Sequence, residues 1–410
     1  MKILVLTQFY PPEIAAGGLR MADMIRIWRE QGHEVTVVTA VPNYPTGVVW
    51  PEYRRRFLVD ERDPSGARVL RCWIVPGENG RNVSRVASFL SFAVSSLVVS
   101  LLRAGPADVV IASSPPLTVA AAGRIVALLK RARFVFDVRD LWPDALKSLG
   151  VLAGWPLRLC EGLESWLYRA ADRVIVVSPA FVAHVAARRP DGDRVIHLVS
   201  NGVDLDLFAS RTGADRDAVR TWLDIPRDAT LLMYVGTFGM VHELESVLPA
   251  LDRLRSKNVY AAFVGDGAGR DILLSEAHRL RLDNVRFPGL QAHERAPALY
   301  AAADIGLSVV RESAATDKVI ASKILEIMAA GRPLLAVGGQ EIRRIVEEAG
   351  CGAWVAVGDA EGFIRSVTEL AGGQGNGHFG RAGREYAASH YDRRRLAARY
   401  GRIMNELCGT

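Results

Sequence analysis

Short apolar runs alternate with amphipathic stretches along the chain. The runs are continuous and are not broken by polar residues, which is typical of strands buried on both faces of a parallel sheet. The first half predicts such strands at residues 2–7, 34–39, 69–75, 109–112, 134–138, 174–177 and 195–199. The second half repeats the scheme at residues 230–235, 261–264, 285–287, 305–309, 334–337 and 353–357.

The length of 410 residues favours two domains over one. A polar stretch at residues 210–217 separates the two sets of strands. We therefore predict a first domain at 1–205, joined by a C-terminal helix at about 388–410, and a second domain at 206–387. Parallel strands need right-handed crossovers, so the predicted fold class is α/β with two Rossmann-like, doubly wound domains. Ligands of such sheets bind at the carboxyl ends of the strands, and two such domains facing each other would form a central cleft.

The charge and the cysteines of the chain indicate which kinds of binding partner and compartment to expect. The net charge of +6 and the pI of about 9.2 suit an anionic partner, such as a sugar-nucleotide diphosphate, a lipid diphosphate or an acidic membrane surface. Nucleic acid is not expected, because the basic residues are not interleaved with aromatic residues in any binding motif. The four cysteines, at positions 72, 160, 351 and 408, form no metal-binding spacing, which favours reduced thiols in the cytoplasm.

One uncharged segment is a candidate for contact with a membrane. Residues 86–102 hold neither charge nor proline, but they include five serines and fall short of the roughly 20 apolar residues of a span. We expect a buried or membrane-surface helix here. The arginines at 54–56, beside Trp50 and Tyr53, fit a solvated face, and peripheral contact with an anionic membrane is the alternative. The chain begins directly with a strand, so no signal peptide is expected.

Two glycines follow the first predicted strand. Gly17 and Gly18 precede a helical pattern at 19–31, where backbone N–H groups can approach a phosphate at the positive end of the helix dipole. A turn that needs a left-handed residue would explain them equally well. The absence of a GxGxxG motif argues against a dinucleotide-dependent dehydrogenase.

Polar residues crowd the end of another predicted strand, in the string RDLWPD at 139–144. Asp140 could orient a sugar hydroxyl, and Arg139 could neutralise phosphate charge. An ion pair that caps the strand is the structural alternative.

Two stretches of the second half offer similar chemistry. Gly236, Thr237 and Gly239 follow the first strand of that half, again between a strand and a helix. The segment KVIASKILEIMAAGRP at 318–333 has apolar residues at helical spacing. Lys323 and Glu326 are three positions apart in it and would be neighbours on a helix.

Four strings together resemble the retaining glycosyltransferases of family 4, which share the GT-B fold. They are LTQFYPPE at 6–13, VTAVPNYPTG at 38–47, RDLWPD and the 318–333 segment. They resemble the bacterial O-antigen and colanic-acid subgroup, including transferases of fucosamine. The resemblance implies transfer of a sugar from a nucleoside-diphosphate sugar, with UDP expected, to a glycan or polyprenyl-diphosphate-linked acceptor with retention of configuration. It also implies a protein at the cytoplasmic face of the inner membrane, no metal or other cofactor, and a last helix that crosses back to the first domain.

The resemblance also implies roles for single residues. Glu326 matches the second Glu of a Glu-x7-Glu pattern, which holds the ribose hydroxyls, whereas Lys318 stands where the first Glu is expected. Gly17 and Gly18 match a loop that meets the donor diphosphate. Arg286 and Phe287 match a segment whose main chain pairs with the base.

Thr237 stands where many family members have an arginine that grips the donor phosphates. We therefore predict that Lys318 and Lys323, both expected on the helix of Glu326, replace that clamp. The predicted catalytic set is Asp140, Arg139 and Lys318. Glu312 is a further candidate for the role of the missing first Glu, and no metal ligands are expected.

Two other functions stay open at this point. Sugar-nucleotide 2-epimerases use a similar fold but need dedicated carboxylate acids and bases around the sugar. A non-catalytic protein that binds nucleotide sugars would explain Lys318 and the missing arginine.

Overall fold

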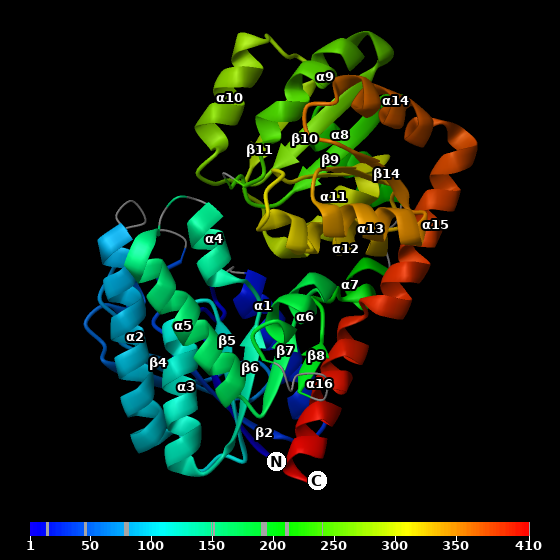
Figure 1. The fold of residues 1–410 in the computed structure, drawn as a ribbon. Coiled ribbons are helices and arrows are strands. Elements are labelled where there is room, and N and C mark those ends of the chain that lie inside the picture. Colours follow the sequence, from blue (N-terminus) through cyan, green and yellow to red (C-terminus); the bar gives the residue numbers. More distant parts are fainter. Residues whose placement is uncertain are drawn as a thin grey trace. The chain divides into compact units, whose positions relative to one another are not determined.

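The computed structural model describes residues 1–409 apart from 14–15, 45–46, 78–81, 149, 151, 190–194, 210–212 and 240. The chain divides into two compact units, one of Met1–Asn201 with Arg393–Thr410 and one of Gly202–Asp392. Each unit is built on a largely parallel sheet covered by helices, as the fold class predicted (Figure 1). The predicted limits, 1–205 with 388–410 and 206–387, lie close to these along the chain.

The sheet of the first unit has the order β3-β4-β2-β1-β5-β6-β7-β8. Its strands are β1 (Lys2–Leu6), β2 (Glu34–Ala40), β3 (Leu58–Arg62), β4 (Arg68–Cys72), β5 (Val109–Ser114), β6 (Arg133–Val138), β7 (Arg173–Val176) and β8 (Ile196–Leu198). All neighbours pair in parallel except β3 and β4. The sequence did not predict β3. This strand lies at the edge of the sheet and carries charged residues, so it lacks the apolar run that marks a central strand.

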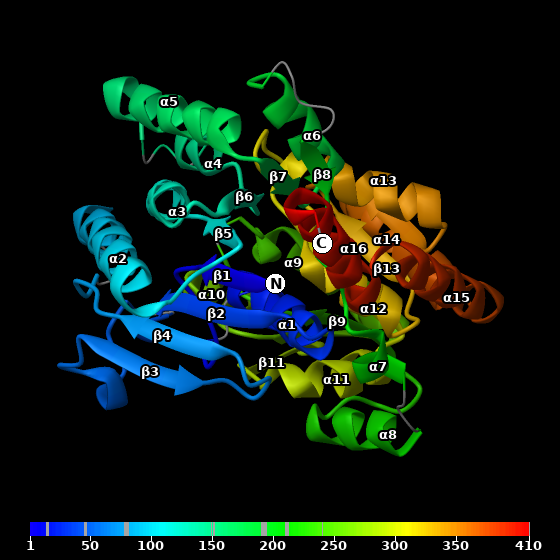
Figure 2. The same ribbon diagram turned by 90° about the horizontal axis from the view of Figure 1, so that it is seen from below.

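The helices of the first unit form two layers. They are α1 (Ala16–Glu30), α2 (Asn82–Arg103), α3 (Leu117–Lys130), α4 (Trp142–Ser148), α5 (Gly154–Ala170), α6 (Pro179–Ala186) and α16 (Arg393–Cys408), with the 3-10 turn η1 (Pro51–Tyr53). Figures 1 and 2 show α2, α3 and α5 on one side of the sheet, with α1 and α16 on the other. By length and composition alone, the Val86–Arg103 part of α2 could cross a membrane.

The end of the chain completes the core of the first unit. The C-terminal helix was expected at about 388–410, but α15 (Gly373–His390) ends within that range and the last helix begins at Arg393. The last helix, α16, then packs on α1, where the Trp28 indole Nε1 donates to the Ala397 carbonyl at 3.1 Å and the Trp28 and Tyr400 rings meet at 5.1 Å. The predicted return of the last helix to the first domain is thus confirmed.

The sheet of the second unit is wholly parallel, with the order β11-β10-β9-β12-β13-β14. Its strands are β9 (Thr230–Val235), β10 (Val259–Val264), β11 (Val285–Gly289), β12 (Ile305–Val309), β13 (Leu334–Val337) and β14 (Gly352–Val355). Its helices are α7 (Leu205–Ala209), α8 (Gly213–Trp222), α9 (Leu248–Leu254), α10 (Arg270–Arg279), α11 (Ala296–Ala302), α12 (Ser322–Ala329), α13 (Gln340–Ala349), α14 (Ala360–Ala371) and α15 (Gly373–His390). The 3-10 turns are η3 (Leu244–Val247), η4 (Arg255–Lys257), η5 (His293–Arg295) and η6 (Thr316–Lys318).

Successive residues of a strand enter different cores. In β9, Leu231 and Met233 join the cluster under α11, α12 and α13, whereas Leu232 and Tyr234 join the cluster under α9 and α14. This alternation follows from the two-residue period of a strand. Because both faces are buried, polar side chains of the sheet gather at its ends.

One ion pair inside the first unit is buried. The Arg20 guanidinium of α1 donates to both Asp137 oxygens of β6 at 3.1 and 3.0 Å, and the two side chains are 6% and 0% exposed. Arg20 also donates to the Val199 carbonyl at 3.1 Å. These bonds fix the start of α1 against the ends of two strands.

We predict that Asp137→Ala lowers the free energy of unfolding by about 3–5 kcal/mol, because it leaves the Arg20 charge buried without its partner. Urea denaturation followed by circular dichroism measures the loss. The matched control is Glu30→Ala, which breaks the exposed Arg26–Glu30 pair and should cost at most about 0.5 kcal/mol. Equal losses in the two variants would contradict the buried pair's role.

Candidate functional site

In the first unit the structure brings Gly17 and Arg139 together. The sequence predicted Gly17 and Gly18 just before a helix, but both lie in the first turn of α1. A Cβ atom on Gly17 would lie 1.0 Å from Arg139 Nη1, and one on Gly18 would lie 2.8 Å from the Phe9 carbonyl oxygen. Close approach, not a left-handed backbone, therefore explains the glycines.

Hydrogen bonds hold the Arg139 guanidinium in this position. Its Nε donates to Ser113 Oγ at 2.8 Å, and that hydroxyl donates to Asp137 Oδ2 at 2.7 Å. Burial lowers the pKa of Arg139 to about 10, with Asp137 opposing the shift, so the group stays charged at neutral pH. A fixed cation thus lies beside the N-terminus of α1, where free N–H groups also attract anions.

Asp140 follows at once in the chain, half-buried at the end of β6. Burial raises the pKa of its carboxyl group, and the charge of Arg139 opposes this shift. Asp140 thus places a carboxyl group next to Arg139 along the chain, and its contact with a sugar hydroxyl stays a prediction.

Two of the family-like strings meet through Glu13. This carboxylate is fully buried, and its Oε1 accepts from the backbone N–H groups of Asn43 and Tyr44 at 2.7 Å each. Glu13 thereby fixes the loop after β2 against the loop after β1. Its sequence neighbours gave no signal of this role.

In the second unit, Lys323 lies beneath the loop that begins at Gly236. The φ angle of Gly236 is 147°, which favours glycine, and a Cβ atom there would lie 3.5 Å from Lys323 Nζ. The ammonium group donates to the Tyr234 hydroxyl and lies 3.8 Å from the centroid of that ring. The Tyr234 hydroxyl in turn donates to the Thr237 carbonyl at 2.8 Å, which orders the loop.

The surroundings of Lys323 weaken its hold on a proton. Burial lowers the pKa of Lys323 to about 7, and the charge of Glu326 opposes the shift. Burial, followed by the charge of Lys323, lowers the pKa of the nearby His242 to about 3. An anion placed beside Lys323 would hold the proton on it. His242 is half-buried near the Tyr234 ring, with the two ring centroids 6.3 Å apart.

Glu326 meets a residue that the sequence did not indicate. The Glu326 Oε1 atom lies 3.0 Å from His293 Nε2, and the carboxylate is 18% exposed. His293 comes from η5, far away in the chain, so no local pattern could reveal the pair. The bond orients the carboxylate that is predicted to hold ribose hydroxyls.

Other predicted residues lie elsewhere in the unit. Lys318 belongs to η6 and not to the helix of Glu326, because the chain is not helical between Lys318 and Ser322. This corrects the prediction that Lys318 and Lys323 share one helix. Glu312 is exposed, and Gly239 lies in the loop after β9.

The side chains of Arg286 and Phe287 are structural. The Arg286 guanidinium donates to the Leu223 and Asp224 carbonyls at 2.9 Å each, and the Phe287 ring stacks on Phe263 at 5.7 Å. Only their main chain stays available for the predicted contact with a base.

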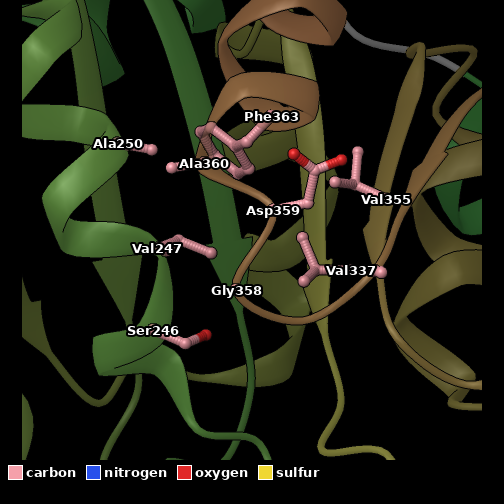
Figure 3. Close-up of a pocket in the computed structure, with 10 residues that line it drawn as sticks. Ser246, Val247, Ala250, Val337, Val355, Gly358, Asp359, Ala360 and Phe363 are labelled. Carbon is pink, nitrogen blue, oxygen red and sulfur yellow. The ribbon is translucent and has the colours of Figure 1, made fainter.

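A small hollow elsewhere in the second unit does not fit a nucleotide sugar. Figure 3 shows its wall of Val247, Ala250, Val337, Val355 and Phe363, with Asp359 at its edge. Its empty volume of about 210 Å³ includes open solvent, so the enclosed space is too small for a nucleotide sugar. Asp359 instead caps α14 by accepting from the Gly362 N–H at 2.8 Å.

Within the part of the chain that the structure describes, no group of three or more His, Cys, Asp or Glu side chains could hold a metal ion. The charged residues of the candidate site form two polar groups, one with Arg139 and Asp140 in the first unit and one with Lys323 and Glu326 in the second.

Comparison with known proteins decides the family. The Glycosyl transferase 4-like domain matches residues 16–202, and the Glycosyl transferases group 1 domain matches residues 229–372. WcaI of Escherichia coli (strain K12), named as a colanic acid biosynthesis glycosyl transferase, is 32% identical over 337 residues, 81% of this chain and 82% of WcaI. This chain is a family 4 glycosyltransferase.

Further comparisons agree with this family. The glycosyltransferase WbjE of Pseudomonas aeruginosa is 27% identical over 308 residues, 73% of this chain and 75% of WbjE. The structure of HepE from Anabaena in complex with UDP has a TM-score of 0.74 at 17% identity, over 99% of this chain and 100% of HepE. The TM-score for sucrose-phosphate synthase of Thermosynechococcus elongatus is 0.78 at 19% identity, over 99% of this chain and 98% of the synthase. The glycosyltransferase has the GT-B fold.

We predict that Gly17→Ala lowers kcat/KM by about 10- to 100-fold. The new methyl group would displace the Arg139 guanidinium and so remove the charge-assisted hydrogen bond that Arg139 is predicted to donate to a phosphate. Arg139→Ala should give the same loss. The double variant should be no worse than either single variant, since both remove one interaction. Losses that multiply in the double variant would contradict this explanation.

Proposed function

We propose that this glycosyltransferase moves a hexose derivative from a nucleoside-diphosphate sugar, with uridine as the base, to a glycan or polyprenyl-diphosphate-linked acceptor. The transfer retains the anomeric configuration and serves bacterial surface polysaccharide synthesis. The observation that carries the proposal is the arrangement on α12, where Lys323 lies under the Gly236 loop and Glu326 lies one helical turn further on.

The arrangement suits departure of a nucleoside diphosphate from the anomeric carbon. Negative charge grows on the leaving phosphate, and a buried cation with oriented N–H groups stabilises it. Lys323 and the N–H groups at Gly236, Thr237 and Gly239 have this role in the proposal. Glu326 accepts hydrogen bonds from the ribose hydroxyls, and the main chain at Arg286 and Phe287 contacts the base.

The first unit supplies the remaining groups in this proposal. The N-terminus of α1 at Gly17 and Gly18, together with Arg139, adds positive potential for the diphosphate, and Asp140 orients a hydroxyl of the transferred sugar. Lys318 adds a second cation at the phosphate. With these charges the reaction needs no metal, so EDTA should leave the rate unchanged.

The relatives support the process and the nucleotide. WcaI is named for colanic acid biosynthesis, and LpsE of Rhizobium meliloti, 28% identical over 224 residues, is named for lipopolysaccharide core biosynthesis. HepE, which has the same fold, was solved with UDP and with UDP-glucose.

Incubation of the enzyme with a labelled UDP-sugar and an oligosaccharide acceptor tests the proposal. The expected product keeps the anomeric configuration of the donor, as read from the one-bond C–H coupling in its NMR spectrum. An inverted linkage would contradict retention, and epimerised donor in the absence of acceptor would identify an epimerase instead. Donor binding without turnover on any acceptor would identify a non-catalytic protein.

Glu326→Gln should weaken UDP binding by about 1.5–3 kcal/mol, the contribution of a charge-assisted hydrogen bond. Calorimetry measures the change. The 2′,3′-dideoxyribose analogue of UDP lacks the ribose hydroxyls, so it should bind the wild-type protein as weakly as UDP binds the variant. The analogue should also bind the wild-type protein and the variant with equal affinity. A variant that still discriminates between the two nucleotides would remove Glu326 from the ribose site.

Lys323 should make donor affinity depend on pH. Only the protonated amine attracts the diphosphate, so affinity for a UDP-sugar should be full below about pH 7 and fall by up to about tenfold per pH unit above it. Calorimetric titrations from about pH 6 to 8.5 measure the slope. Lys323→Met should abolish the slope, whereas Lys318→Ala should retain it and reduce kcat more than affinity. A slope that survives in Lys323→Met would contradict the assignment.

A further inference from the structure

Helix α2 has its small polar residues buried and its large apolar residues exposed. The buried positions recur every four residues, at Ser88, Phe92, Ser96 and Ser100, and none is more than 6% exposed. The outer positions recur at the same spacing, at Val86 (51% exposed), Leu90 (53%), Val94 (64%), Val98 (48%) and Leu102 (76%). A helix on the surface of a protein in water shows the reverse pattern.

Two serines of α2 are satisfied within the helix, whereas the buried Ser100 hydroxyl has no hydrogen-bond partner among the described residues. The Ser96 hydroxyl donates to the Ala93 carbonyl at 3.1 Å, and the Ser91 hydroxyl donates to the Ser88 carbonyl at 2.9 Å. Such bonds satisfy a small hydroxyl within its own helix. Small side chains let α2 lie close to its neighbours, while the outer residues contribute nothing to the core of the unit.

Two neighbouring helices extend the exposed apolar surface. Helix α3 packs against both α2 and α5, on the same side of the sheet (Figures 1 and 2). It exposes Ile125 (41%), Leu128 (64%) and Leu129 (61%), and α5 exposes Trp155 (76%), Leu159 (66%) and Trp166 (44%). We call these residues, with the five outer residues of α2, the three-helix face. Single exposed apolar residues are ordinary, but a group spread over three adjacent helices marks an interaction surface.

Positive charge predominates in the sequences of these three helices. The sequences of α2, α3 and α5 contain six cations, Arg85, Arg103, Arg124, Lys130, Arg158 and Arg169, against the two anions Glu161 and Glu164. Glu164 is 1% exposed, and its Oε2 atom lies 3.3 Å from His184 Nε2, so its charge is engaged inside the unit. A partner of this face must therefore be apolar at its centre and anionic at its rim.

We propose that the three-helix face docks on a bilayer that contains anionic phospholipids. Its aliphatic residues would enter the boundary between headgroups and acyl chains, its tryptophans would lie at headgroup level, and its cations would meet lipid phosphates. A second copy of the chain fits less well, because the cations of two identical faces would oppose one another. The proposal does not depend on the sugar transferred.

The predicted basic patch at residues 54–56 is a separate feature. The three arginines are exposed, but Trp50 and Tyr53 are half-buried. Phe57 is 78% exposed beside Trp73, with the two rings 6.3 Å apart. This patch offers mainly charge, whereas the three-helix face offers apolar area, so substitutions can separate the two.

Flotation of the full-length protein with vesicles tests the proposal. The vesicles contain phosphatidylcholine alone or with about a third phosphatidylglycerol. We expect binding to the anionic vesicles, reduced but not abolished by about 0.5 M NaCl because the apolar contact persists. The variant Leu90→Gln, Val94→Gln, Val98→Gln should lower the partition coefficient at least about tenfold.

The matched control replaces exposed apolar residues of the second unit, with Ile272→Gln and Leu290→Gln (45% and 67% exposed), and should bind vesicles as the wild type does. Thermal unfolding checks that the triple variant is folded, and retained transfer to a soluble acceptor separates lost docking from lost chemistry. Equal flotation of the triple variant and the wild type would overturn the proposal. So would a dimer in sedimentation velocity that the triple variant loses, because a second copy would then cover the face.

Discussion

Burial of both faces of each parallel sheet is the constraint on which the rest of this glycosyltransferase depends. In β9, Leu231 enters one core and Leu232 the other, so an unpaired polar group on either face of the sheet is costly. Polar groups of the sheets therefore gather at the carboxyl ends of strands, where Arg139 and Asp140 follow β6 and Gly236 follows β9. The polar group of each unit follows from this one packing rule.

The buried charge of Asp137 is paired, and its pairing fixes the polar group of the first unit. Asp137 binds Arg20 and, through Ser113, holds the Arg139 guanidinium against Gly17. Lys323 is the contrasting case, because its ammonium group has a tyrosine hydroxyl and ring as partners and Glu326 as a nearby charge. A buried cation without a full counter-charge favours an anionic ligand, which is the chemistry that a nucleoside diphosphate offers.

Helix α2 departs from the pattern that governs the other helices. Its buried side is built of serines around Phe92, and its large residues face outward beside those of α3 and α5. Exposing this surface to water is unfavourable, which is the observation behind the proposed docking on a bilayer. An enzyme that docks in this way would act on acceptors held at the membrane.

The sequence by itself determined the parallel strands, the two-domain α/β fold and the family, and it predicted the stretches of the candidate site, because all of these depend on local periodicity and short motifs. Tertiary structure alone decided which distant residues meet. Gly17 meets Arg139, Glu13 meets the loop at Asn43, and Glu326 meets His293 through strand order and helix packing, which no local pattern encodes. The same holds for the edge strand β3, which has no apolar run, and for Lys318, which the chain places in a turn before α12. Periodicity reports how a residue is placed within its own element, whereas burial and partners are set by elements that come together only when the chain folds.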